Sequence, residues 1–365
     1  MRRNSWIALL VLTIAFTAAA ALVLDRRAER LAVQTYGQPL FPDLADRINR
    51  IATLEFATGQ GTWTLSRDAA GVWHHDARSG YPADADQVKR LAVALSRATV
   101  VAPKTADPAL YDRLRVGEPR QLGADEDPDK VRTSVRVVAR DGDGTEMAGL
   151  IIGKTAKRAT STDPAEIYVR RTGEDRSWLA RGFLDVKQKP TEWLDQDLFK
   201  VTKDRVRTIR VARADAEPLI LERNDQDAIH VRDLPDTLRE KEIRITSTAR
   251  ALEFVKPRDV RPVDEVDFAA AVTTTFTTRD GWTVTVDTVP AGFRTEDSDA
   301  YWLRFAIDFD RAAIPADSGI DADAAAAQAA KALETVKGWA YLLPEFTAQN
   351  FLPTLTSLTE TKEES

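Results

Sequence analysis

Apolar and polar residues alternate over short stretches of this chain, a pattern that predicts β-strands. One set of such stretches lies in residues 48–73 and a second in residues 206–231. Each set has two alternating strands, a turn rich in Gly, Asp or Asn, and a third short strand. We therefore interpret the chain as containing one structural pattern twice.

A helix and a hairpin follow the three strands in each copy. In the first copy, Asp84 or Asp86 caps a run whose apolar residues share one helical face, and residues 245–255 have similar spacing in the second. An Asp-Gly turn then joins two alternating strands, at Asp141 in the first copy and at Asp280 in the second. The predicted fold class is α+β, with two similar domains that each have a mainly antiparallel sheet and a packed helix.

An uncharged stretch at residues 5–24 precedes the two domains. As a helix it would extend roughly 30 Å, the thickness of a hydrocarbon core. This length favours an uncleaved transmembrane anchor, and the alternative is a signal peptide cleaved at the alanines of residues 18–21. A short tail before the anchor and a long domain after it favour export. We therefore expect a single-pass inner-membrane protein with the bulk of the chain in the periplasm or extracytoplasmic space.

The expected domain organisation has five parts. They are a membrane anchor at residues 1–24, a stalk at 25–46, a first α+β repeat at 47–200, a second at 201–353 and a polar tail at 354–365.

Composition narrows the possible functions. The chain has 365 residues, of which 43% are hydrophobic and 30% are charged, as in a folded protein. Its net charge of -6 disfavours nucleic acid as a partner, because phosphate contacts require a basic face. The absence of cysteine excludes disulfides, thiolate metal sites and a cysteine nucleophile, and only 3 histidines are present for general-base or zinc chemistry.

Three motifs resemble functional sites, but each has a simpler structural interpretation. Residues 148–155 fit a relaxed phosphate-loop pattern; their apolar interior instead indicates a buried strand, with Gly153 as a strand-end turn. His74 and His75 are adjacent on a strand and point to opposite faces, so they are poorly placed to share a metal ion. Residues 141–146 resemble the start of a calcium-binding loop but lack its later ligands, which favours a hairpin turn.

The remaining candidates are acidic residues and tryptophans. Residues 125–129 and the pair Asp297 and Asp299 lie in polar loops, which do not provide the different environments that a catalytic carboxylate pair needs. Four tryptophans on strands are candidates for a sugar-stacking platform, although strand aromatics usually belong to the core: Trp63, Trp73, Trp282 and Trp302. We predict no catalytic, cofactor-binding or metal-binding residue.

Several short motifs follow the uncharged segment in a fixed order. They are Leu-Phe-Pro-Asp-Leu at residues 40–44, Ile-x-x-Ile at 48–51, Leu-Ser-Arg and Val-Trp within 65–73, Pro-Ala-Asp-Ala-Asp at 82–86, and Leu-Ile-Ile-Gly-Lys-Thr at 150–155. Over residues 40–345 this layout resembles the bacterial domain of unknown function 4340 family. The resemblance implies a membrane-anchored extracytoplasmic protein, often encoded beside or fused to parts of gliding-type ABC transporters. It implies no catalytic residue.

We therefore expect a noncatalytic, membrane-anchored accessory or interaction module rather than an enzyme. Its expected partners are the inner membrane and an ABC-transporter permease, and no cofactor is expected. The alternatives are a protein that binds envelope glycan or lipid, and an extracytoplasmic hydrolase that uses carboxylates. An exposed apolar sheet edge or a groove between the copies would favour the interaction module. A concave pocket with convergent carboxylates and a tryptophan would favour the alternatives.

Overall fold

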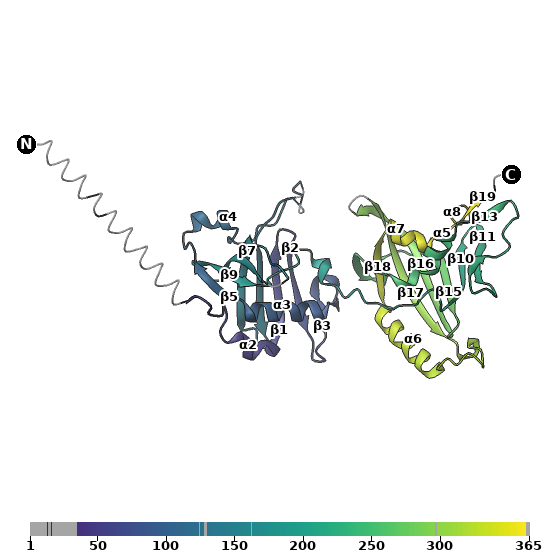
Figure 1. Ribbon diagram of the computed structural model, residues 1–365, viewed down its shortest axis with the longest axis horizontal. Helices are drawn as coiled ribbons and strands as arrows, with labels where there is room; N and C mark the ends of the chain where they lie inside the picture. The colour runs from purple at the N-terminus through teal and green to yellow at the C-terminus, as the bar shows by residue number, and fades with distance from the viewer. Residues whose placement is uncertain are drawn as a thin grey trace, which may run out of the picture. The chain divides into compact units, whose positions relative to one another are not determined.

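The computed structural model describes residues 13, 16, 35–123, 125–127, 130–161, 163–295 and 298–362. The chain divides into two compact units, Met1–Trp193 and Leu194–Ser365. Each unit is built on an antiparallel sheet with a few helices, an α+β architecture (Figure 1). None of the helices in the described residues is long and apolar enough to cross a membrane. Apart from Thr13 and Phe16, the predicted anchor lies outside the described residues.

The first unit contains a nine-stranded sheet with the order β4-β3-β2-β1-β6-β7-β8-β9-β5. Its strands are β1 Ile51–Thr58, β2 Gly61–Arg67, β3 Trp73–His75, β4 Tyr81–Pro82, β5 Thr99–Pro103, β6 Val135–Asp141, β7 Glu146–Lys157, β8 Ala165–Arg171 and β9 Ser177–Gly182. Its helices are α2 Leu44–Arg47, α3 Ala85–Arg97 and α4 Tyr111–Leu114.

Helix α3 lies across the strands of the first sheet (Figure 1). Asp84 is its N-cap, and the Asp84 carboxylate accepts the backbone N–H three residues further on at 2.9 Å. Val88, Leu91 and Leu95 lie on one face of α3 and belong to the same buried core as the sheet residues. Burial of an aliphatic side chain of this size contributes about 1.5–3 kcal/mol. This apolar face therefore holds α3 on the sheet.

The second unit contains an eight-stranded sheet with the order β12-β11-β10-β15-β16-β17-β18-β14, and a two-stranded sheet of β13 and β19. Its strands are β10 Val206–Arg213, β11 Ala216–Arg223, β12 Ile229–Val231, β13 Leu238–Glu240, β14 Asp259–Pro262, β15 Val272–Thr278, β16 Trp282–Thr295, β17 Ser298–Phe309, β18 Trp339–Pro344 and β19 Thr359–Thr361. Its helices are α5 Glu242–Ala249, α6 Ala322–Val336, α7 Glu345–Ala348 and α8 Leu355–Leu358.

The two large sheets have the same strand order. If β3 is matched with β12, each later strand in the order of one sheet has a counterpart in the other, up to the edge strands β5 and β14. Among the described residues, strand β4 of the first sheet has no counterpart in the second. A register shift follows Ile51 in β1 and also follows Val206 in β10. The stretches at residues 63–65 and 219–221 occupy equivalent strands, β2 and β11. The shared order therefore extends to a local irregularity of the backbone.

An ion pair recurs at the Asp-Gly turn of each large sheet. Arg50 precedes β1, and its Nη2 lies 3.2 Å from Oδ2 of Asp141. Arg205 precedes β10, and its Nη2 lies 2.7 Å from Oδ2 of Asp280. Asp141 is buried, and its Oδ1 accepts two backbone N–H groups of its own turn. The predicted hairpin turn is confirmed. Through its ion pair with Arg50, Asp141 links that turn to the start of β1.

The chain ahead of α2 covers the outer edge of β5. Val100 donates its N–H to the carbonyl of Gln38 and accepts the N–H of Gly37, both at 2.8 Å. Leu40 donates its N–H to the carbonyl of Ala98 at 2.7 Å. Backbone groups at a sheet edge otherwise invite pairing with another chain, so this segment protects the edge of the first sheet.

Gly153 lies inside β7, so its interpretation as a strand-end turn is wrong. A Cβ at this position would lie 2.4 Å from the carbonyl oxygen of Leu114 and 2.6 Å from that of Arg115. The chain at the end of α4 thus passes so close to β7 that only glycine fits. Residues 148–155 lie entirely in β7, as the predicted buried strand, and do not form a phosphate loop.

Gly153→Ala is expected to lower the free energy of unfolding by about 1–3 kcal/mol, because an added methyl group must displace packed backbone. Gly142→Ala is the matched control, since no atom lies within 4 Å of a Cβ there. That substitution should change the free energy of unfolding by no more than about 0.5 kcal/mol. Denaturant unfolding measures both values, and equal stability of the two variants would contradict the close approach at Gly153.

Candidate functional site

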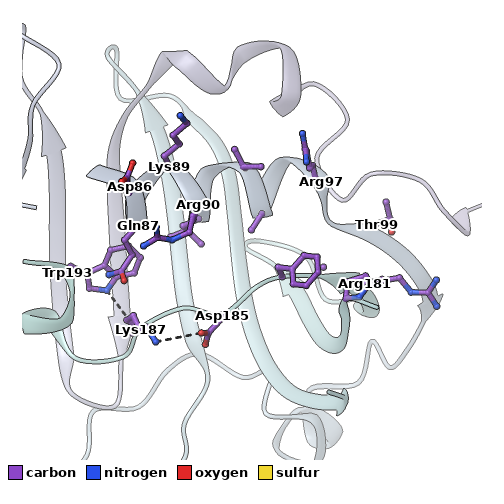
Figure 2. A pocket seen from close by; sticks show the side chains of 16 residues that line it. Asp86, Gln87, Lys89, Arg90, Arg97, Thr99, Arg181, Asp185, Lys187 and Trp193 are labelled. Carbon is purple, nitrogen blue, oxygen red and sulfur yellow. Dashed lines mark hydrogen bonds and ion pairs between the residues drawn. The ribbon is translucent and has the colours of Figure 1, made fainter. Parts of the chain in front are cut away.

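A groove with a volume of about 870 Å³ lies beside α3 in the first unit (Figure 2). One wall is α3 and the other is the chain that follows β9, up to Trp193. Asp84 donates its backbone N–H to the carbonyl of Trp193 at 2.8 Å. The Nε2 of Gln87 donates to the carbonyl of Glu192, also at 2.8 Å. These two hydrogen bonds hold the end of the second wall against the start of α3.

Much of the groove surface is apolar. The apolar lining residues are Leu91, Val93, Ala94, Pro164, Phe183 and Trp193. Trp193 is buried, and its Nε1 donates to the carbonyl of Lys187 at 3.2 Å. Phe183, in contrast, is 63% exposed. A large exposed ring beside a concave apolar surface is typical of a binding site.

Positive charge exceeds negative charge along the groove. The charged lining residues are the cations Lys89, Arg90, Arg97, Arg181 and Lys187 and the carboxylates Asp86 and Asp185. Lys187 lies 3.7 Å from Asp185 and is paired with it. Lys89 and Arg97 form no hydrogen bond or ion pair with another described residue. This excess of positive charge favours an anionic ligand.

The predicted opposite orientation of His74 and His75 is confirmed. His75 is fully buried, and its Nε2 lies 3.1 Å from the carbonyl oxygen of Pro190. His74 is partly exposed; its Nδ1 lies 2.8 Å from the carbonyl oxygen of Gly80 and its Nε2 lies 2.9 Å from the Asp68 carboxylate. The hydrogen bond to Asp68 raises the pKa of His74, and the same bond lowers the pKa of Asp68. Because both acceptors bind N–H groups, the protonated imidazole is favoured.

The other candidates within the described residues include acidic side chains in surface ion pairs and tryptophans that are buried. Glu126 is paired with Arg120 at 2.6 Å, and Asp299 is paired with Arg294 at 3.5 Å, while Asp297 lies outside the described residues. The four strand tryptophans are at most 9% exposed and belong to the core, not to a sugar-stacking platform: Trp63, Trp73, Trp282 and Trp302. In the described part of the chain, no group of three or more His, Cys, Asp or Glu side chains could hold a metal ion.

The groove residues were not among the candidates found from the sequence. A signal was present, because Arg90, Ala94 and Arg97 recur at helical spacing on the outer face of α3. The opposite wall, however, comes from residues that follow β9, much later in the chain. The pairing of β5 with β9 places this wall beside the end of α3.

The fold and the groove define a protein of two antiparallel α+β units with a cation-lined groove in the first. The chain belongs to the family described as Domain of unknown function (DUF4340), whose model matches residues 73–270. This confirms the family expected from the short motifs at residues 40–155. The matched region includes α3, β9 and both walls of the groove. Searches of curated proteins and of solved structures found no match.

The pair of His74 and Asp68 predicts a pH-dependent stability. The raised pKa of His74 gives a contribution that is fully present below the unfolded pKa of about 6.5 and is lost as pH rises through the folded value. The lowered pKa of Asp68 gives a contribution present above about pH 4 and lost as pH falls through its folded value. The pair therefore stabilises the fold most between about pH 4 and pH 6.5.

His74→Ala is accordingly expected to lower the melting temperature more at about pH 5.5 than at about pH 8. Asp68→Asn removes the same pair from the other side and should show the same trend. Thermal unfolding of both variants and of the unmodified chain at the two pH values measures the effect. Equal losses at both pH values would show that the pair contributes no charge-dependent stability.

Proposed function

We propose that this protein is a noncatalytic interaction module, a membrane-anchored accessory subunit of an ABC-transporter-type envelope complex. The observation that carries the proposal is the groove beside α3, whose lining includes the exposed ring of Phe183 and two cations without a partner among the described residues, Lys89 and Arg97. Lys89 and Arg97 are carried by α3, and Phe183 directly follows β9, so the backbone of the surface rests on regular structure. Family membership supports the envelope setting and the transporter partner through the association expected for such proteins.

The lining of the groove supports docking over a hydrolase and over glycan stacking. Its two carboxylates are Asp86 and Asp185, and Asp185 is already engaged by Lys187 (Figure 2). A glycoside hydrolase of the common kind needs two carboxyl groups on either side of the scissile bond. Sugar stacking needs an exposed aromatic face, and the groove's tryptophan, Trp193, is only 1% exposed.

The proposed setting places both units outside the cytoplasm, held by residues 5–24 in the inner membrane. The support is the length of this uncharged segment, together with the long domain that follows it. The proposed partner is a permease-class membrane protein, which would lie within reach of a module tethered to the same membrane.

A reporter that is active only outside the cytoplasm, fused to the C-terminus, is expected to be active and to remain with the membrane fraction. The matched control lacks residues 1–24, which should leave the reporter inactive and release the protein from the membrane. Recovery of soluble protein whose N-terminus lies near Ala21 would instead establish a cleaved signal peptide. An inactive reporter on the full chain would contradict export.

Replacement of Phe183 by a photoreactive benzoylphenylalanine tests the docking surface in native membranes. Illumination is expected to join the chain to one membrane protein, because an exposed aromatic side chain in a groove is a preferred contact. Val72, 45% exposed in the turn between β2 and β3, is the matched control position and should give no such product. The same products from both positions, or none from Phe183, would argue against docking through the groove.

A further inference from the structure

The shared strand order places a concave surface at equivalent positions in the two units. In the second unit, α5 precedes the edge strand β14, as α3 precedes β5, and α7 follows β18. A cavity of about 280 Å³ lies between the chain at the end of α5 and that at α7, and Phe254 and Phe346 line it. Phe183 directly follows β9, and Phe346, 69% exposed, lies two residues after β18. An exposed phenylalanine thus recurs beside the crossing helix in both units.

The two concave surfaces differ in charge. Arg250 is the one charged residue that lines the cavity of the second unit in the described chain, and it is paired with Glu253 at 2.9 Å. Five cations line the groove of the first unit. Since the second unit has a concave surface beside its corresponding helix without such a set of cations in its described lining, the shared strand order does not require them. The cationic lining is therefore a property of the first unit that points to its ligand.

The cations of the first groove are spread along its length. Figure 2 shows Arg97 and Arg181 at one end and Arg90 and Lys187 at the other. Arg90 and Arg97 are about 10 Å apart along the axis of α3, at 1.5 Å per residue. One phosphate or carboxylate group would reach only one end. The arrangement instead matches a ligand with anionic groups at both ends.

The middle of the groove is suited to an apolar group. Val93 and Ala94 lie between Arg90 and Arg97 on α3, and both line the groove with Phe183. A ligand that spans the groove therefore meets cations, then an apolar surface, then cations again. Within a polypeptide, this order corresponds to acidic residues on both sides of an aliphatic or aromatic residue.

We propose that the groove of the first unit binds an acidic segment of a partner protein, with an apolar residue at its centre. This inference rests on the proposed function, since it names the chemistry of what docks there. The apolar residue packs on Phe183 and Ala94, and carboxylates on either side bind the cations.

Arg97 has no partner among the described residues, whereas Arg181 lies 2.7 Å from Glu166. Arg97 is thus a stronger anchor than Arg181, because no described residue offsets its charge. At the other end, Arg90 lies 3.8 Å from Asp84 and Lys187 lies 3.7 Å from Asp185, so a ligand carboxylate there would share these cations with the chain's own carboxylates.

The test uses the purified full-length chain in detergent and an array of short peptides. Each peptide has Asp or Glu at both ends and Leu, Ile, Phe or Trp in the middle, and a matched array replaces every acidic residue by Lys. We expect binding to members of the acidic array only, and binding that weakens as salt is added, because exposed charges are screened.

The double variant Arg90→Glu with Arg97→Glu reverses charge at both ends and should weaken binding by at least about tenfold, since like charges oppose docking. Arg113→Glu is the matched control, because Arg113 is exposed on α4 and does not line the groove; it should bind as the unmodified chain does. An unchanged melting temperature establishes that each variant is folded.

Two outcomes would overturn the proposal. The first is that no acidic peptide binds better than its lysine counterpart, or that the double variant binds as well as the Arg113→Glu control. The second is that vesicles of phosphatidylglycerol, and not the peptides, bind in a way that the double variant abolishes, which would identify a lipid as the occupant. If photo-crosslinking from Phe183 still captures a membrane protein in either case, the proposed docking function is supported and only the acidic chemistry of the ligand is contradicted.

Discussion

The groove depends on one constraint, which is that the chain must cross the face of the first sheet between β4 and β5. These strands lie at opposite edges, so the connection between them spans the sheet, and α3 is the part that does so. Burial of Val88, Leu91 and Leu95 fixes which side of α3 faces the strands. The remaining side, with Arg90 and Arg97, is then left to form a wall. The second sheet has the same constraint, because β12 and β14 lie at its opposite edges.

The second wall is fixed by different contacts. The ring of Trp193 lies 4.7 Å from that of Phe56, centroid to centroid, within the core of the first unit. Phe183, at the start of this wall, stays exposed although its burial would contribute about 1.5–3 kcal/mol. Burial of Phe183 by the proposed partner would make this contribution available to binding. Because hydrogen bonds and core packing already hold both walls, binding would order few further groups, which lowers its entropic cost.

The sequence predicted those features that depend on neighbouring residues. The Asp-Gly turns, the capped helix and the alternating strands are local patterns, and the structure contains each of them. It did not predict β5 or β14, because short edge strands become recognisable only through pairing with β9 and β18. Gly153 was misinterpreted for the same reason, since the carbonyl groups that exclude a side chain there belong to the distant residues Leu114 and Arg115.

The attachment of the N-terminal segment to β5 has a mechanical consequence. Tension on the chain ahead of Gly37 would enter the first unit through its backbone hydrogen bonds with Val100 and those of the following residues. Thr99, the neighbour of Val100 in β5, pairs with Arg181 of β9, and both residues line the groove. Force on this segment and a ligand in the groove would therefore act on the same two strands, β5 and β9. With the proposed anchor and the proposed ligand in place, a load on the chain ahead of Gly37 would change the free energy of binding in the groove.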